Sequence, residues 1–172
     1  MVKRIHKKVC LLGDFAVGKT SLVRRFVYNL FDDKYISTIG VKVNRKTVAV
    51  PRDGGIVELT MMLWDMAGTE EFEMMRRSYL RGASGAVWVC DVTRSETLDS
   101  LSVYADSLAK VSPGAQLILA ANKRDLVDQQ QITPPQIEAI AADLKVPYYL
   151  TSAKTSEEVD ALFYHLGRLL VA

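Results

Sequence analysis

Several features are scarce or missing in this sequence, and each absence excludes a class of protein. Its 172 residues include only two cysteines, Cys10 and Cys90, both within apolar stretches, so they indicate neither a disulfide framework nor a metal site. No apolar run approaches the length of a membrane span, and the N-terminus has no signal segment. A net charge of +2, without a long basic block, gives no electrostatic basis for binding nucleic acid.

What remains is an ordinary globular composition, with 49% hydrophobic and 24% charged residues. The length suits one hydrophobic core, so we predict a single domain over residues 1–172. Reduced cysteines and the absence of a signal favour the cytoplasm. The C-terminus offers no cysteine for prenylation, so we expect no lipid anchor in this chain.

Short β-rich runs alternate with segments of helical period, a pattern typical of an α/β fold with helices on both faces of a largely parallel sheet. Strands are predicted at 7–13, 41–50, 57–66, 86–91, 117–122 and 148–151. Helices are predicted at 19–30, 71–80, 95–110, 134–144 and 157–170. Only a short connection separates the second and third strands, so these form a hairpin and one strand runs antiparallel to the others.

The segment Gly13-Asp14-Phe15-Ala16-Val17-Gly18-Lys19-Thr20 fits the pattern G-x-x-x-x-G-K-[ST]. The apolar strand before it and the helix after it favour a phosphate-binding loop over an ordinary strand-to-helix turn. In such a loop the backbone N–H groups and the helix N-terminus meet a phosphate, Lys19 adds a point charge, and the Thr20 hydroxyl is a Mg²⁺ ligand. The candidate phosphate-binding residues are Asp14, Phe15, Ala16, Val17, Gly18, Lys19, Thr20 and Ser21.

Three more segments follow predicted strands, at the sheet edge where ligands of open α/β folds bind. Asp65 stands where a Mg²⁺-linked carboxylate is needed, and Gly68 where a backbone N–H can approach a γ-phosphate. The segment Asn122-Lys123-Arg124-Asp125 ends in a carboxylate that can accept two hydrogen bonds from guanine, whereas adenine has no matching donors. The backbone of Ser152-Ala153-Lys154 can meet the guanine O6.

From Val9 to about Leu169 the sequence resembles a small GTPase of the Ras superfamily, most of all its Rab-like branch. The resemblance implies the P-loop small GTPase fold, with a six-stranded mixed sheet and five helices, and binding of GTP or GDP with Mg²⁺. It assigns Phe31 to the guanine, Tyr35 to the phosphates and Thr38 to Mg²⁺ and the γ-phosphate. The expected metal ligands are thus Thr20, Thr38 and Asp65, and the expected catalytic residues are Lys19, Thr38, Gly68 and Thr69.

Two positions depart from the family pattern. Thr69 replaces the glutamine that usually orients the attacking water, and a threonine hydroxyl is too short for that reach. The Rap branch also has threonine here and relies on a partner protein for the missing group. Phe15 stands where an arginine from an activating protein would enter, which puts that mechanism in doubt.

We therefore predict a guanine-nucleotide-dependent switch that hydrolyses GTP slowly and recruits an effector in its GTP state. The alternative is a GTP-binding interaction module that hardly hydrolyses. A different P-loop enzyme, such as a kinase, is disfavoured by the guanine-binding segment. An effector, an exchange factor and an activating protein are the expected partners. Because membrane-bound relatives end in a cysteine-bearing tail, this chain is either a cytosolic relative or one from which such a tail was removed.

Overall fold

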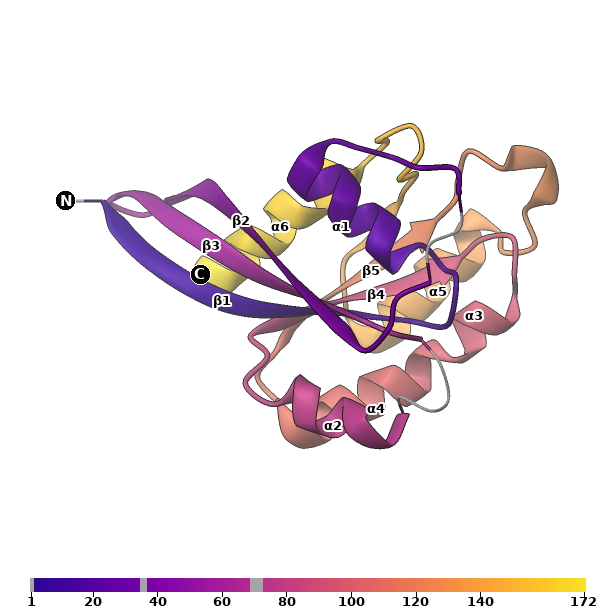
Figure 1. The fold of residues 1–172 in the computed structure, drawn as a ribbon, viewed down its shortest axis with the longest axis horizontal. Helices are drawn as coiled ribbons and strands as arrows, with labels where there is room; N and C mark the ends of the chain where they lie inside the picture. The colour runs from indigo at the N-terminus through magenta and orange to yellow at the C-terminus, as the bar shows by residue number, and fades with distance from the viewer. Residues whose placement is uncertain (1, 35–36, 69–72) are drawn as a thin grey trace.

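The computed structural model describes residues 2–34, 37–68 and 73–172, in which a six-stranded sheet carries helices on both faces (Figure 1). The strands are β1 Lys3–Leu12, β2 Val41–Arg52, β3 Gly55–Met66, β4 Gly85–Asp91, β5 Gln116–Asn122 and β6 Tyr148–Leu150. The α-helices are α1 Lys19–Tyr28, α2 Glu73–Leu80, α3 Glu96–Asp99, α4 Leu101–Val111, α5 Pro134–Leu144 and α6 Val159–Val171. A short 3₁₀ helix, Val127–Gln129, follows β5.

The strand order is β2-β3-β1-β4-β5-β6, and the pairing of β2 with β3 is antiparallel while the other pairs are parallel. This confirms the predicted mixed sheet and its hairpin. After β1 the chain goes to the edge strand β2 and returns through β3, and it then crosses to β4 on the other side of β1 and continues outward through β5 and β6. The direction of winding therefore changes between β1 and β4. A ligand crevice is expected outside the carboxyl ends of these two central strands.

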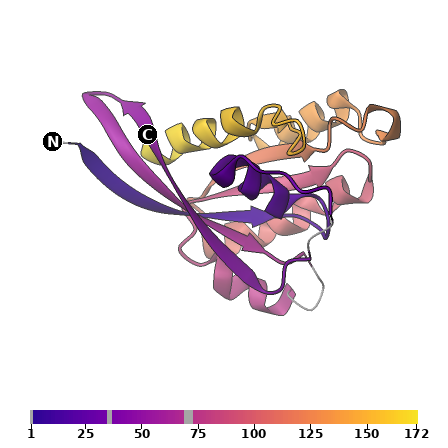
Figure 2. The ribbon, with the colours of Figure 1, turned by 45° about the horizontal axis from the view of Figure 1, so that its top comes forward.

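Helices lie on both faces of the sheet, as the two ribbon views show (Figure 2), and each face has its own hydrophobic core. On one face α1 and α6 pack over β1 and β3, and the rings of Phe26 and Phe163 stack with centroids 4.2 Å apart. On the other face α2, α4 and α5 pack around the buried Trp88 of β4. Residues from both faces of β4 and of most of β5 are buried, which agrees with the nearly continuous apolar sequences of these two strands.

The hairpin is longer and tighter than the sequence predicts. β2 continues to Arg52 and β3 begins at Gly55, so only Asp53 and Gly54 connect them. Gly54 has a φ of +91°, a conformation that glycine adopts freely. The long β3 also pairs with the charged start of β1, where Lys3 lies opposite Val57. β1 therefore begins at Lys3 and not at residue 7. Backbone hydrogen bonds to β3 keep this polar segment in the sheet, although its side chains give no apolar pattern.

Helix boundaries differ from the predictions where single residues leave helical geometry. α1 ends at Tyr28 because Asn29 has a φ of +54°, and α6 begins at Val159 because Glu158 has a φ of +58°. The helix predicted at 95–110 is divided at Ser100 into α3 and α4, so that the five predicted helices correspond to six α-helical segments. The helix at 134–144 matches its prediction, with Gln136 accepting from the Thr133 N–H at 2.7 Å.

Both cysteines lie in the core, Cys10 in β1 and Cys90 in β4, with no exposed surface. Burial raises the pKa of each thiol to about 12, so the reactive thiolate is scarce at neutral pH.

We expect neither thiol to react with a chromogenic disulfide reagent in the folded protein at pH 7.5. The same reagent should report both thiols once urea unfolds the chain. Rapid labelling of either cysteine before unfolding would contradict the described burial.

Candidate functional site

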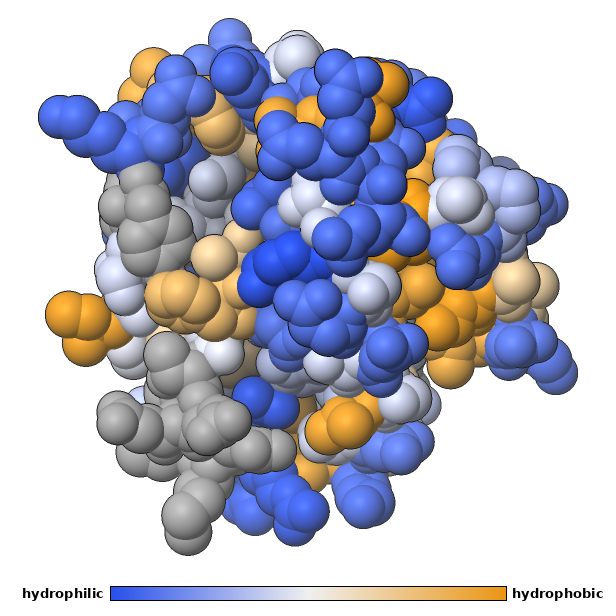
Figure 3. Space-filling model, turned by 90° about the vertical axis from the view of Figure 1, so that its right-hand side faces the viewer, coloured by the Kyte–Doolittle hydropathy of each residue, from blue (hydrophilic) through white to orange (hydrophobic). Residues whose placement is uncertain are grey.

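A cavity of about 350 Å³ opens at the carboxyl ends of the central strands, at the expected crevice. Figure 3 views this end of the molecule, where hydrophilic residues form most of the visible surface. The walls come from the loops after β1, α1, β3, β5 and β6. The lining residues are Phe15, Ala16, Gly18, Lys19, Thr20, Ser21, Phe31, Asp32, Asp33, Lys34, Thr38, Met66, Gly68, Asn122, Lys123, Asp125, Leu126, Ala153 and Lys154.

The Lys19 side chain folds back along the loop that precedes it. Its ammonium donates to the carbonyls of Gly13 at 2.7 Å and Asp14 at 2.8 Å. Burial lowers the pKa of Lys19 to about 8, although the nearby carboxylates of Asp65 and Asp14 oppose this effect. Within residues 2–34, 37–68 and 73–172, no carboxylate pairs directly with Lys19, and a buried cation of this kind is electrostatically prepared for an anion such as phosphate.

Three oxygen-bearing side chains from separate segments meet beside Lys19. The Thr20 hydroxyl donates to Asp65 Oδ2 at 2.6 Å, and it lies 2.6 Å from the Thr38 hydroxyl. Thr20 has only one proton to donate, so Thr38 is the donor in the second bond. The sequence predicted these three residues as metal ligands, and the described geometry brings them together.

The same cluster suits a small divalent cation. Asp65 is buried, and its Oδ1 atom has no hydrogen-bond partner among the described residues. Burial raises the pKa of Asp65, although the Thr20 bond and the Lys19 charge oppose it. The described residues contain no group of three or more His, Cys, Asp or Glu able to hold a metal. Any cation here would therefore depend on one carboxylate, two hydroxyls and its own water, a set that fits Mg²⁺.

Gly68 lies directly against the phosphate-loop candidate. A Cβ atom at this position would stand 2.6 Å from the Phe15 backbone nitrogen and 2.8 Å from Lys19 Nζ. Only glycine allows this approach, because a neighbouring backbone atom cannot move aside as a flexible side chain can. The segment after β3 thereby reaches the same part of the cavity as the loop after β1.

Asn122 lies at the end of β5, and its side chain connects the loops after β1, β5 and β6. Its amide nitrogen donates to the Val17 carbonyl at 3.0 Å, while its amide oxygen accepts from the Thr151 hydroxyl and the Ala153 N–H. Asn122 is only 2% exposed, so each of these bonds is shielded from water. A Cβ atom on Gly18 would approach Asn122 Nδ2 to 2.3 Å, so the glycine is also required for this contact.

Asp125, on the loop after β5, lines the same cavity as Lys19. The buried Ser152 hydroxyl donates to its Oδ1 atom at 2.7 Å and fixes the carboxylate, which still lines the cavity. The loop after β6 is held in turn by Arg25 of α1, which donates to the carbonyls of Ala153 and Lys154 at 2.8 Å. A ligand group in this place would meet the Asp125 carboxylate as an acceptor, and Ala153 and Lys154 also line the cavity here.

The remaining predicted residues fall into three groups. Phe31, Lys123 and Ser21 line the cavity as expected. The side chains of Val17 and Ser152 are buried and do not line the cavity. These residues could therefore act on a ligand only through their backbone groups or through the hydrogen bonds that they make. Tyr35 and Thr69 lie outside the described residues, so their placement stays a prediction.

Asp14 turns away from the cavity towards α4. Its two carboxylate oxygens accept from the Ser100 hydroxyl at 2.7 Å and from the Tyr104 hydroxyl at 2.9 Å. Arg76 of α2 lies over the Tyr104 ring, 4.3 Å from its centroid. The Asp14 side chain therefore anchors the loop, and only its backbone remains for a ligand.

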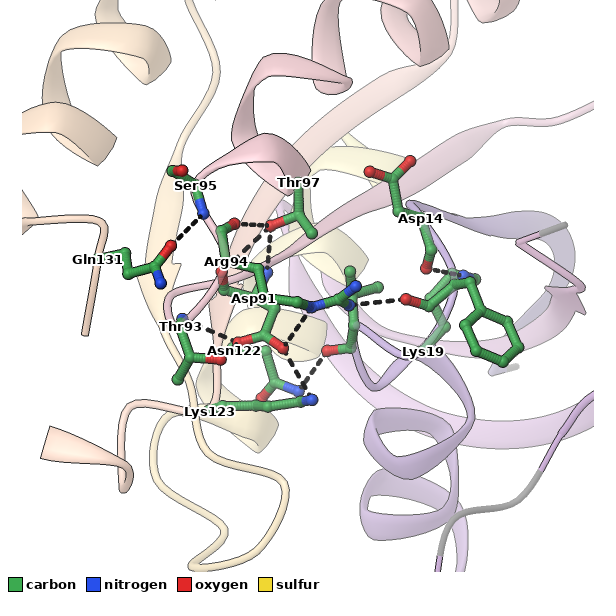
Figure 4. A network of polar contacts seen from close by, with 12 residues as sticks. Asp14, Lys19, Asp91, Thr93, Arg94, Ser95, Thr97, Asn122, Lys123 and Gln131 are labelled. Atoms are coloured by element: carbon green, nitrogen blue, oxygen red, sulfur yellow. Dashed lines mark hydrogen bonds and ion pairs between the residues drawn. The ribbon is translucent and has the colours of Figure 1, made fainter. Parts of the chain in front are cut away.

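Sequence reasoning missed a charged network that follows β4 (Figure 4). The buried Asp91 accepts from Lys123 at 2.8 Å and from Arg94 at 3.2 Å, and Arg94 donates to the Phe15 carbonyl at 2.7 Å. Burial alone would raise the pKa of Asp91, but the bonds from Lys123 and Thr93 outweigh it, so the pKa is lowered. The sequence did contain one signal for this network: Asp91 ends a buried strand, and a buried carboxylate needs a partner.

Fold and site together define a nucleotide-binding α/β protein with a phosphate loop. A model of the Ras family matches residues 8–172, so the chain belongs to this family of GTP-binding switch proteins. The comparison confirms the predicted resemblance to the Ras superfamily. Among the described residues, no helix is long and apolar enough to cross a membrane.

Relatives on the Rab-like branch cover nearly the whole chain. Ras-related protein SEC4 of Saccharomyces cerevisiae is 37% identical over 164 residues, 95% of this chain and 74% of that protein. GTP-binding protein ypt5 of Schizosaccharomyces pombe is 36% identical over 171 residues, 98% of this chain and 80% of that protein. Ras-related protein Rab-13 of Rattus norvegicus is 35% identical over 162 residues, covering 94% and 78% respectively.

The contact between Gly18 and Asn122 can be tested with two glycine-to-alanine variants. Gly18 and Gly54 both have positive φ angles, +102° and +91°, so alanine at either costs about 1 kcal/mol of backbone strain. Only at Gly18 would the new methyl displace a buried side chain, because no atom lies within 4 Å of a Cβ built on Gly54. We expect Gly18→Ala to lose about 2 kcal/mol more than Gly54→Ala in urea unfolding. Equal losses would contradict the described contact.

Proposed function

We propose that this protein is a Mg²⁺-dependent guanine-nucleotide switch that hydrolyses GTP slowly. One observation carries the proposal: a single cavity is lined both by the neighbouring Lys19, Thr20, Thr38 and Gly68 and by Asp125 from the loop after β5. The first group suits the phosphates of a nucleotide, and Asp125 suits a base that donates hydrogen bonds. The membership of the Ras family supports the same reading.

We propose that guanine is the base that binds beside Asp125. Its N1–H and 2-amino groups would donate to Asp125, and its O6 would accept from the backbone around Ala153 and Lys154. Ser152 supports this role, because its bond to Oδ1 fixes the carboxylate and leaves the other oxygen available. Adenine would leave the half-buried carboxylate without donors, at the cost of an unpaired charge.

Mg²⁺ would be held by the hydroxyls of Thr20 and Thr38 and by the carboxylate of Asp65. The ion would neutralise charge that develops between the β- and γ-phosphates during hydrolysis. Lys19 would add a second positive charge, since it has no direct carboxylate partner among the described residues. The Gly68 N–H would meet the γ-phosphate, since its lack of a side chain permits close approach.

A switch needs two segments that respond to the γ-phosphate together. Thr38 precedes β2 and Gly68 follows β3, and the two ends are joined because the Ala67 N–H donates to the Gly40 carbonyl at 2.9 Å. A γ-phosphate that draws in one residue would thus also shift the other. We propose that an effector reads this joint change at the surface around residues 32–38 and 68–80, and that an exchange factor and an activating protein control it.

Hydrolysis is the step for which the chain is least equipped. In place of glutamine it has Thr69, and the 44% exposed Phe15 stands at the cavity wall where an incoming arginine would need space. Thr69 favours a slow intrinsic rate, and Phe15 disfavours acceleration by an arginine from a partner. They also favour the second candidate, a GTP-binding interaction module that hardly hydrolyses, which single-turnover hydrolysis with and without partner proteins would separate from the first.

The guanine assignment is tested through Asp125. We expect Asp125→Ala to weaken GDP binding by about 2 kcal/mol or more, since a paired charge-assisted contact disappears. Asp125→Asn should move the preference towards xanthine nucleotides. The exposed Asp128, which does not line the cavity, offers a matched control in Asp128→Asn. Competition titrations with GDP, XDP and ATP measure the preference, and equal competition by ATP in the parent protein would rule out the assignment.

The hydrolysis assignment is tested through Thr69. We expect Thr69→Gln to raise the single-turnover rate by up to about a hundredfold, because a longer amide can orient the attacking water. If the Phe15 ring crowds the new amide, combining Phe15→Gly with Thr69→Gln should raise the rate by more than the two separate effects added as free energies. A Thr69→Gln variant that is slower than its parent would show that the water is positioned by another group.

A further inference from the structure

Arg94 bridges two loops of the nucleotide site without lining its cavity. Its Nη2 atom donates to the Phe15 carbonyl at 2.7 Å, and its Nε atom donates to Asp91 Oδ2 at 3.2 Å. The planar guanidinium makes both contacts at once, a geometry that suits arginine better than lysine. Figure 4 shows the Arg94 side chain between Asp91 and the phosphate loop.

The Phe15 carbonyl belongs to a peptide group whose orientation matters for a ligand. In a trans peptide the N–H points opposite to the C=O, so the bond from Arg94 directs the Ala16 N–H away from Arg94. Phe15 and Ala16 both line the cavity, whereas Arg94 does not. The arginine thus holds the carbonyl side of this peptide and leaves its N–H side for an anion.

This peptide needs external support because Ala16 has a φ of +61°. That left-handed conformation costs a residue with a side chain about 1 kcal/mol or more, a cost that glycine avoids. Other carbonyls of the same loop have donors of their own: Gly13 and Asp14 accept from Lys19, and Val17 accepts from Asn122. Arg94 supplies the corresponding donor at the one strained position.

Asp91 fixes the arginine in turn. It is 1% exposed, lies at the end of β4, and also accepts from Thr93 and Lys123. The bond to Asp91 Oδ2 thus orients the Arg94 guanidinium. The bond to the Phe15 carbonyl is the contact by which Arg94 reaches the phosphate loop.

We propose that Arg94 is a positioning residue for the β-phosphate of a bound guanine nucleotide, acting by holding the Phe15–Ala16 peptide with its N–H towards the cavity. The proposal rests on the proposed nucleotide binding. It predicts an effect on nucleotides that carry a β-phosphate and none on the recognition of guanine.

The test compares GDP with GMP, which lacks the β-phosphate, on Arg94→Ala and its parent. We expect Arg94→Ala to release GDP about tenfold faster, the effect of one lost charge-assisted bond. Its affinity for GMP should stay within about twofold. Arg4→Ala is the control, because Arg4 pairs with Glu58 on the remote end of β1 and β3. Should Arg94→Ala fail to fold, Arg94→Lys carries the same comparison, since it keeps a charge beside Asp91 without the planar fork.

Each outcome has a distinct meaning. Faster GDP release with unchanged GMP affinity supports the proposal. An unchanged GDP release rate overturns it, as does an equal weakening of GDP and GMP, which would mean that Arg94 acts on the guanine loop or on the fold. A parent protein that binds neither nucleotide would overturn the proposed function itself.

Discussion

The hydrogen bond from the Asn122 side chain to the Val17 carbonyl holds the site together. It is 3.0 Å long and buried, and it ties the loop after β5 to the loop after β1. The same amide accepts from Thr151 and Ala153, which brings the loop after β6 into the assembly. Gly18 makes the bond possible, since any side chain there would collide with the amide. Because these loops carry the groups for phosphate and for guanine, their spacing depends on this one residue.

Around this link the molecule holds polar groups in unfavourable surroundings. Lys19 is buried with a lowered pKa, Asp65 has a raised pKa and an Oδ1 atom without a partner among the described residues, and Ala16 has a strained backbone. Each arrangement costs stability in the protein alone, and a bound phosphate or cation would offset the cost at Lys19 and Asp65. A fold that maintains such a site must stabilise it elsewhere, and the two cores on either face of the sheet supply that support.

Much of the fold could be predicted from the sequence because its signals are local. The glycine and lysine spacing of residues 13–20 specifies the loop, and Thr133-Pro134-Pro135 specifies a helix start that is confirmed. The start of β1 could not be predicted, because Lys3 joins the sheet by pairing with a strand more than fifty residues away. The roles of Asp14 and Arg94 were missed for the same reason: their partners on α4 and on the loop after β1 become visible only when distant segments meet.

The central claim is that three loops joined through Asn122 form a site for a guanine nucleotide with Mg²⁺. The most direct measurement is to denature freshly purified protein and identify the released nucleotide by chromatography and mass spectrometry. The account predicts about one GDP or GTP for each chain, which chelation of Mg²⁺ should release from the native protein. Protein that retains an adenine nucleotide, or that remains empty and fails to bind added GDP with Mg²⁺, would contradict it.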